Sequence, residues 1–218
     1  MPAPGLRLLP SNVDGPPPWH EACRMFLDSL RLQRYSPATL SWYERILFPF
    51  GRYLREEAGT DDPAAVSEGR VRAFLLKAGE QGLDGRRPVG ARRLNHYRQG
   101  LSLFYRWMQA EGYVSHNPAE RIRKAREPKP LIPALSEAQV RALVEAPDRS
   151  RFVGLRDRCF LLLLLDTGVR LSEALGLRVR DLDLEQRSVT VMCKGNKERR
   201  LALSPYLLSE LTPYLRKR

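Results

Sequence analysis

Two cations, Arg170 and Lys194, each stand beside a tight turn, where they could act on a phosphate. Arg170 follows Gly168, and glycine ends helices readily because it tolerates the left-handed conformation. A guanidinium that leaves such a turn is well placed for a bidentate contact with a phosphodiester. Glu173 lies three residues further on and would hold the orientation of Arg170. The alternative is an ordinary ion pair between Arg170 and Glu173 on the surface.

Lys194 is the next candidate, because it lies where a predicted strand ends and a turn through Gly195 and Asn196 begins. Its flexible ammonium could reach a phosphate or protonate a leaving oxygen. The alternative is a solvated hairpin lysine. A charged run continues beyond the turn and is expected mainly to keep an edge strand soluble. It comprises Lys197, Glu198, Arg199 and Arg200.

A second group of candidates lies on and before a helix predicted over residues 91–111. One side of this helix is apolar and the opposite side is polar. The polar side could enter the major groove of DNA while neighbouring arginines bind phosphates. The alternative is a solvated helix face. The candidate DNA-binding residues are Arg86, Arg87, Arg92, Arg93, Asn95, Gln99 and Arg106.

The composition favours a nucleic-acid partner. Among 218 residues, 37 Lys and Arg against 25 Asp and Glu give a net charge of +12. Such an excess attracts a polyanion through phosphate contacts and the release of condensed counterions. We find no apolar run of membrane-spanning length and no secretory signal, so we expect a cytoplasmic protein without a membrane partner. The cysteines Cys23, Cys159 and Cys193 lack paired spacing, which predicts reduced, mostly buried thiols and no metal site.

Proline content and apolar spacing divide the chain into an arm, two domains and a linker. Residues 1–15 are rich in proline and are predicted to form a flexible arm. Residues 16–111 are predicted to form a four-helix bundle. Its helices are expected over 19–33, 37–54, 66–79 and 91–111. Residues 112–132 combine prolines with basic residues and are predicted to be an extended, solvated linker.

Residues 133–218 are predicted to form a mostly helical domain with a small antiparallel sheet. Ser136 and Gln139 match a capping box that opens a helix. Residues 156–167 are apolar nearly all round, which predicts a central helix buried on most sides. After Asp181 the apolar spacing changes to two, which predicts two or three strands. A last helix is expected from Pro205 onward.

The motifs around Arg170 and Lys194 together resemble those of the tyrosine recombinase (phage integrase) family. The resemblance covers residues 19–218 and implies a mainly α protein, with a SAM-like core-binding domain followed by the beginning of an α+β catalytic domain. It implies that Arg170 stabilises the transition state at the scissile phosphate and that Lys194 protonates the leaving sugar oxygen, without a cofactor. The matching segments are Thr167-Gly168-Val169-Arg170-Leu171-Ser172-Glu173 and Lys194-Gly195-Asn196-Lys197-Glu198-Arg199.

The sequence departs from the family's pattern after the hairpin. The family has a His-x-x-Arg box and a nucleophilic tyrosine there, whereas all three histidines precede Arg170. Tyr206 and Tyr214 are the tyrosines that follow Lys194, and we interpret them as packing residues. We therefore expect a C-terminally truncated recombinase, of a kind used for site-specific DNA recombination or integration, that binds DNA but is inactive alone.

The sequence leaves other interpretations open. The chain could be a fragment of a full active recombinase, or a regulator without chemistry that occupies a recombination site. General binding of RNA or another polyanion is a weaker alternative. The expected partners are double-stranded DNA and either a second copy of the chain or a full-length relative. Exposed apolar surface is expected around residues 161–165.

Overall fold

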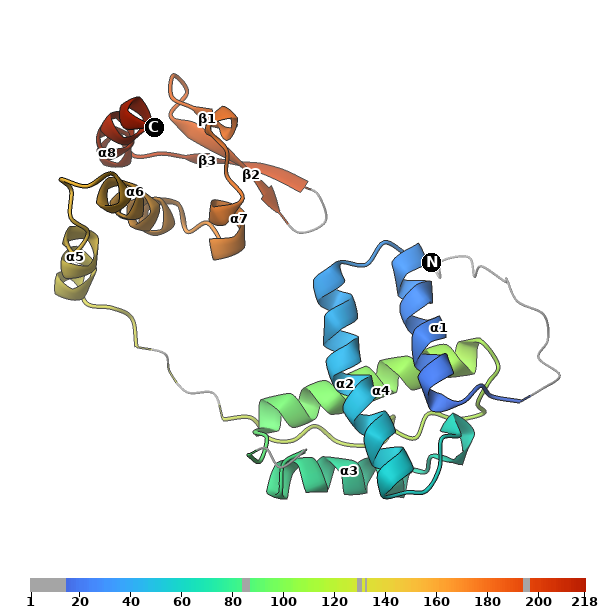
Figure 1. Cartoon of the computed structure of the whole chain (residues 1–218). Coiled ribbons are helices and arrows are strands. Elements are labelled where there is room, and N and C mark those ends of the chain that lie inside the picture. The colour runs from blue at the N-terminus through green and yellow to red at the C-terminus, as the bar shows by residue number, and fades with distance from the viewer. Residues whose placement is uncertain (1–14, 84–86, 129–130, 132, 194–196) are drawn as a thin grey trace. The chain divides into compact units, whose positions relative to one another are not determined.

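A computed structural model of the protein describes residues 15–83, 87–128, 131, 133–193 and 197–218. The chain divides into two compact units, Met1–Pro130 and Leu131–Arg218, which are named the first unit and the second unit below (Figure 1). The first unit is helical, and the second combines helices with a three-stranded antiparallel sheet, so the predicted fold class is confirmed. Within the described ranges, no helix is both long and apolar enough to cross a membrane.

Two α-helices of the first unit begin where a serine supplies a cap. The Ser36 side chain accepts a hydrogen bond from the backbone N–H of Thr39, and Pro37 then opens the helix with its fixed φ. Ser67 caps the next helix in the same way, through the N–H of Arg70. The elements are α1 (Trp19–Leu32), α2 (Pro37–Glu56), the 3-10 helix η1 (Pro63–Ala65), α3 (Glu68–Glu80) and α4 (Ala91–Ala110).

Trp19 lies in the middle of the core of the first unit. Its side chain is 1% exposed, and its indole N–H donates to the backbone oxygen of Leu47 at 3.2 Å. The ring centroids of Phe50 and Phe104 lie 5.1 and 4.9 Å from that of Trp19, in edge-on and tilted arrangements that add to the gain from apolar burial. These contacts join α1, α2 and α4, and so fix the helix that carries most of the candidate DNA-binding residues.

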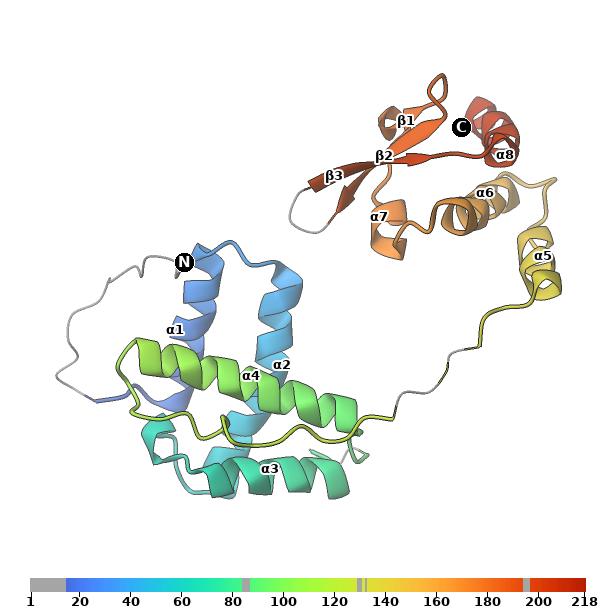
Figure 2. The ribbon, with the colours of Figure 1, turned by 180° about the vertical axis from the view of Figure 1, so that it is seen from behind.

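Helices α2 and α4 cross one another, as Figure 2 shows from behind, and the close approach lies at Gly100. A Cβ atom at Gly100 would lie 2.6 Å from Cδ1 of Ile46, which is closer than side chains approach one another. Glycine therefore permits the α4 backbone to contact the α2 side chain directly. This crossing sets the angle at which the N-terminal halves of the two helices face one another.

Residues 117–127 pack back onto the first unit, which therefore extends further than the predicted bundle. Ala119 is buried, Ile122 is 8% exposed, and both belong to the same apolar core as Trp19. The side chain of Asn117 donates to the backbone oxygen of Ser102 at 3.0 Å. The prolines and charged residues of this segment predicted a solvated linker. Its apolar and amide side chains instead attach it to the helices.

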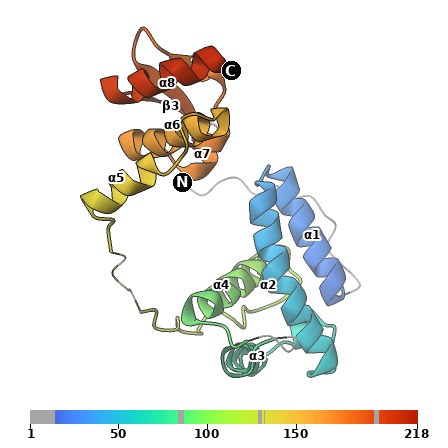
Figure 3. The ribbon, with the colours of Figure 1, turned by 60° about the vertical axis from the view of Figure 1, so that its left-hand side comes forward.

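In the second unit, α6 and α8 cover one face of the sheet (Figure 3). The strand order is β1-β2-β3, so β3 is an edge strand, and Val191 of β2 pairs with Arg199 of β3. Val189 and Val191 belong to the same apolar core as Leu162 of α6 and Leu207 of α8. The elements are α5 (Glu137–Glu145), α6 (Phe152–Thr167), α7 (Leu171–Leu175), the 3-10 helix η2 (Val179–Asp181), β1 (Leu182–Asp183), β2 (Ser188–Cys193), β3 (Lys197–Ala202) and α8 (Pro205–Lys217).

Helix α6 starts earlier than the predicted residue 156. A Cβ atom at Gly154 would lie 1.9 Å from the backbone oxygen of Asp148, so the added first turn packs directly against the preceding loop. Gly168 ends the helix with a φ of 60°, as predicted. Within residues 161–165, Leu162 and Leu163 are buried and Leu165 alone is exposed, at 47%, so the exposed apolar surface is smaller than predicted and limited to the end of the helix.

A buried ion pair joins α6 to α8. The Arg158 Nε donates to Oε2 of Glu210 at 3.2 Å, and neither side chain is more than 12% exposed. This hydrogen bond raises the pKa of Arg158 above its ordinary value. The thiol of Cys159 is also buried in α6, and burial raises its pKa to about 11. A buried charge held by a partner therefore forms part of the interior of the second unit.

Candidate DNA interface and cation site

Arg170 lies at the start of α7, directly after the turn that ends α6. Its backbone is extended, and its Nη1 donates to Oε1 of Glu173 at 2.8 Å. The side chain is nevertheless 68% exposed, because Glu173 holds one edge of the guanidinium and leaves the rest accessible. This geometry suits a contact with a phosphate oxygen, since the donors of arginine form a rigid fork.

The carboxylate of Glu173 lies at the centre of this arrangement. Its side chain is 5% exposed, and Oε2 accepts hydrogen bonds from the backbone N–H of Arg170 at 3.1 Å and from Nη2 of Arg199 at 2.9 Å. The hydrogen bond from the Arg170 side chain lowers the pKa of Glu173, and the charge of Arg199 lowers it further. The same Arg170–Glu173 bond raises the pKa of Arg170, so both groups are charged at neutral pH.

The predicted proton donor, Lys194, lies outside the described residues, as does Arg86. The strands on either side of the turn are described, and Cys193 of β2 pairs with Lys197 of β3. Arg199 lies two residues further along β3 and contacts Glu173. The hairpin strand therefore reaches the carboxylate that holds Arg170, while the role of Lys194 stays a prediction.

The predicted DNA-binding residues of the first unit lie on α4 or just before it. Most of those that the structure describes have exposed side chains, as a contact with DNA requires. Their exposure makes them available but does not by itself test the prediction. The exposed residues are Arg87, Arg92, Arg93, Gln99 and Arg106.

Asn95 is the exception, because its side chain points into the first unit and is 9% exposed. Its Nδ2 donates to the backbone oxygen of Ala125 at 3.0 Å and to the carboxylate of Glu127, and its Oδ1 accepts from the N–H of Ala125 at 2.8 Å. The donors and acceptor of the amide are thus engaged. The structure corrects the prediction that Asn95 faces a base: its partners lie some 30 residues away in sequence, beyond the reach of a helical pattern.

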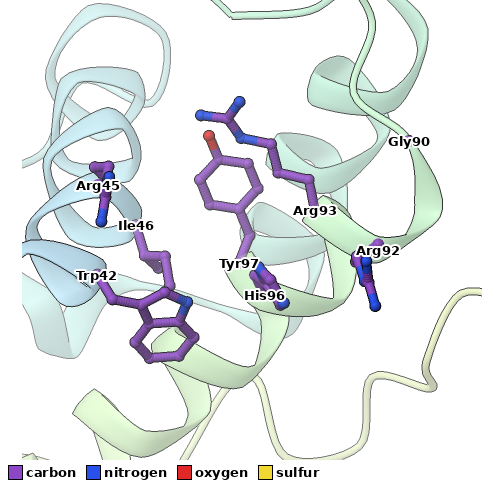
Figure 4. A pocket seen from close by; sticks show the side chains of 8 residues that line it. All are labelled: Trp42, Arg45, Ile46, Gly90, Arg92, Arg93, His96 and Tyr97. Atoms are coloured by element: carbon purple, nitrogen blue, oxygen red, sulfur yellow. The ribbon is translucent and has the colours of Figure 1, made fainter. Parts of the chain in front are cut away.

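A hollow of about 460 Å³ between α2 and α4 contains residues that the sequence analysis did not select. Figure 4 shows Trp42 and Arg45 on the α2 side, with Arg93 and His96 on the α4 side. The Trp42 and His96 rings meet edge-on, with centroids 6.0 Å apart. The sequence signal that could have identified them is the three-residue spacing of Trp42 and Arg45, which places both side chains on one face of a predicted helix. The lining residues are Trp42, Arg45, Ile46, Gly90, Arg92, Arg93, His96 and Tyr97.

The order of the two units, helical first and then mixed with a small sheet, is found in solved structures of other proteins. The fold resembles the crystal structure of a lambda integrase tetramer bound to a Holliday junction, with a TM-score of 0.69 and 18% sequence identity. That likeness covers 94% of this chain and 57% of the other. It shows that the fold, a helical unit followed by a unit of helices and a small sheet, is shared with that integrase.

Sequence comparison then identifies the family. Residues 133–218 match the Phage integrase family. The chain is 34% identical over 191 residues to the tyrosine recombinase XerC of Oceanobacillus iheyensis. These residues are 87% of this chain and 60% of the relative. It is 35% identical over 200 residues to XerC of Pelobacter propionicus, covering 91% and 64%. The chain belongs to the tyrosine recombinase (phage integrase) family and spans less than two thirds of the length of these relatives.

Proposed function

We propose that these 218 residues bind duplex DNA and present Arg170 to a backbone phosphodiester, as part of site-specific recombination or integration. The observation that carries this proposal is the Arg170–Glu173 bond, which fixes a guanidinium whose side chain is 68% exposed. A cation placed in advance stabilises charge that develops on a phosphate without reorganisation during the reaction. Lys194 is proposed to donate a proton to the leaving sugar oxygen, without a cofactor.

The proposed DNA surface lies on α2 and α4 of the first unit. Arg45 on one side of the hollow and Arg92 and Arg93 on the other would bind phosphates and position the duplex. Gln99 and Arg106 lie further along α4 and would reach base edges in the major groove. The proposed set is Trp42, Arg45, Arg86, Arg87, Arg92, Arg93, His96, Gln99 and Arg106, and it leaves out Asn95.

Selection from a random duplex library by the purified chain tests this surface. One sequence is expected to emerge and to resist competition by random DNA. Arg92→Ala should make the negative slope of log affinity against log salt shallower by about 0.9, which corresponds to the loss of one phosphate contact. Gln99→Ala should relax the base preference by about 1–3 kcal/mol. Arg31→Ala removes the same charge from α1, where Arg31 pairs with Asp28, and is the control.

Binding that random DNA abolishes would contradict the proposal of a specific site. Equal losses for Arg92→Ala and Arg31→Ala would contradict the assignment to α2 and α4, since they would show that only the overall charge matters.

We propose further that a polypeptide of these residues alone does not cleave DNA. Tyr206 and Tyr214 both lie on α8. The hydroxyl of Tyr206 accepts a hydrogen bond from Nη2 of Arg158 at 2.9 Å, and the ring of Tyr214 stacks on Phe152 with centroids 5.4 Å apart. A nicked suicide substrate is expected to give no covalent adduct on a denaturing gel. An adduct that disappears in a Tyr206→Phe or Tyr214→Phe variant would contradict this.

A second copy of the chain, or a full-length relative, is the proposed protein partner on DNA. The support is that the lambda integrase of similar fold is a tetramer on its Holliday junction. Light scattering with the selected duplex is expected to give more than one chain per DNA molecule. A complex with one chain at saturating concentration, and no association with the relative, would contradict the proposal.

A further inference from the structure

Arg199 has an unusual position for a residue of a charged run. β3 is an edge strand, and its side chains alternate between exposed and half-buried, with Arg199 and Leu201 on the half-buried side. Residues two apart on a strand share a face, so Arg199 points to the face that Leu201 presents to the core. The neighbouring Arg200 lies on the opposite face and is exposed.

The inward side chain of Arg199 contacts one partner that also holds Arg170. Its Nη2 donates to Oε2 of Glu173 at 2.9 Å, while Arg170 donates to Oε1 at 2.8 Å. The Nε of Arg199 is buried without a hydrogen-bond partner among the described residues. An arginine that served only solubility would extend into water and keep this donor hydrated. The contact therefore connects β3, the strand that follows the hairpin turn, to the start of α7.

The charges of this trio have a consequence for an approaching phosphate. Arg170 and Glu173 alone form a neutral pair, in which the carboxylate repels a phosphate that the guanidinium attracts. Adding Arg199 gives the trio a net positive charge. Arg199 also donates to Oε2 of Glu173 while the Arg170 side chain donates to Oε1, so both oxygens of the carboxylate are held.

We infer that Arg199 is a positioning residue, which acts through Glu173 to orient Arg170 and to offset the negative charge beside it. This inference rests on the proposed function, because it assumes that Arg170 contacts a DNA phosphate. It assigns the β3 strand a role in setting the Arg170 guanidinium. The ordinary explanation of an inward charge on an edge strand is protection against pairing with another strand. The two explanations differ in what they require of DNA binding.

The test measures the salt dependence of binding to the duplex that the full chain selects from a random library. The variants are Arg170→Gln, Arg199→Gln and the double variant. Arg200→Gln is the matched control, since it removes the same charge from the same strand. Nη2 of Arg200 lies 3.7 Å from Oδ2 of Asp183. Each single variant at the site should lower the salt slope by about 0.9. Each should also weaken binding about tenfold, and the double variant should lose no more than Arg170→Gln.

The outcomes separate the inference from the proposed function. If Arg170→Gln has no effect, the phosphate contact of Arg170 is wrong and the proposed function fails with it. If Arg170→Gln weakens binding but Arg199→Gln does not, only the inference is wrong. Additive losses would mean that Arg199 contacts DNA by itself, and equal losses for Arg200→Gln would mean a general charge effect; either result overturns the inference.

A variant that keeps the charge guards against a loss of folding. Circular dichroism and the thermal midpoint establish whether Arg199→Gln is folded. Arg199→Lys retains the positive charge but loses the guanidinium fork, so it is expected to recover at least half of the lost salt slope. A folded Arg199→Lys variant with no recovery would overturn the electrostatic argument.

Discussion

The first unit keeps its core and its cations apart. Trp19, Phe50 and Phe104 fill an apolar interior, and Arg92, Arg93 and Arg106 of α4 lie on its surface. Within the described residues, Arg92 and Arg93 have no ion pair with a carboxylate. Exposed cations on a rigid apolar scaffold suit an extended partner such as a DNA backbone, because each can adjust to a phosphate without disturbing the fold.

The second unit holds its cations on buried carboxylates, since the side chains of Glu210 and Glu173 are 12% and 5% exposed. Arg158 pairs with Glu210 between α6 and α8, and Arg170 and Arg199 share Glu173 between α7 and β3. A cation that must meet one phosphate needs a fixed direction, and a buried carboxylate supplies it at the expense of solvation. The same residue type therefore serves recognition where it is free and orientation where it is held by a carboxylate.

The largest effect is expected from Trp19→Ala. Truncation of a large buried aromatic side chain costs about 3–5 kcal/mol, and here it also removes the hydrogen bond to Leu47. Hydrogen exchange of the full chain should show faster exchange throughout α1, α2 and α4 and no change in α6 and α8. Leu32→Ala is the control, since Leu32 is 84% exposed on the same helix. Equal acceleration in both units would contradict the division into independent parts.

A smaller loss is expected in the second unit from Glu210→Gln. The substitution keeps the shape but removes the charge that holds the buried Arg158, and hydrogen bonds to charged groups contribute about 1.5–3 kcal/mol. Exchange of α6 and α8 amides should accelerate while α1 to α4 are unchanged. Glu185→Gln, at an exposed position, removes the same charge without effect. A stability equal to that of the original chain would mean that apolar packing alone holds α6 to α8.

Asn95→Ala tests the attachment of residues 117–127. It removes three hydrogen bonds to Ala125 and Glu127, and we expect a loss of about 1–2 kcal/mol with early exchange of the Ala125 amide. Gln99→Ala, exposed on the same helix, should stay within about 0.5 kcal/mol. The expected DNA effects are the reverse, with base preference altered by Gln99→Ala only. A change of base preference in Asn95→Ala would restore the original prediction for this residue.

The sequence predicted what local spacing determines. The four helices of the first unit follow from apolar residues three and four apart, and the stop at Gly168 follows from its tolerance of positive φ. The sequence did not predict the contacts of Asn95 and Arg199, because their partners Ala125 and Glu173 are separated from them by a loop or a strand. Polar spacing on a helix or strand cannot distinguish a side chain that meets water from one that meets a distant backbone or carboxylate.

The smallest effect is expected in the titration of Glu173. Its pKa should lie below the ordinary 4.5, first because of the hydrogen bond from the Arg170 side chain. Since the folded value is lowered, the stability that this carboxylate contributes is fully present above the unfolded pKa and is lost as pH falls through the folded one. Carbon NMR of the carboxyl group measures the midpoint.

Arg199→Gln should move this midpoint upward, because the charge of Arg199 also lowers the pKa, whereas Arg200→Gln should leave it in place. A midpoint at or above 4.5 in the original chain would mean that Glu173 is not held between two guanidiniums in solution. The orientation of Arg170 would then depend on the DNA rather than on the fold, and the second unit would treat its cations as the first unit does.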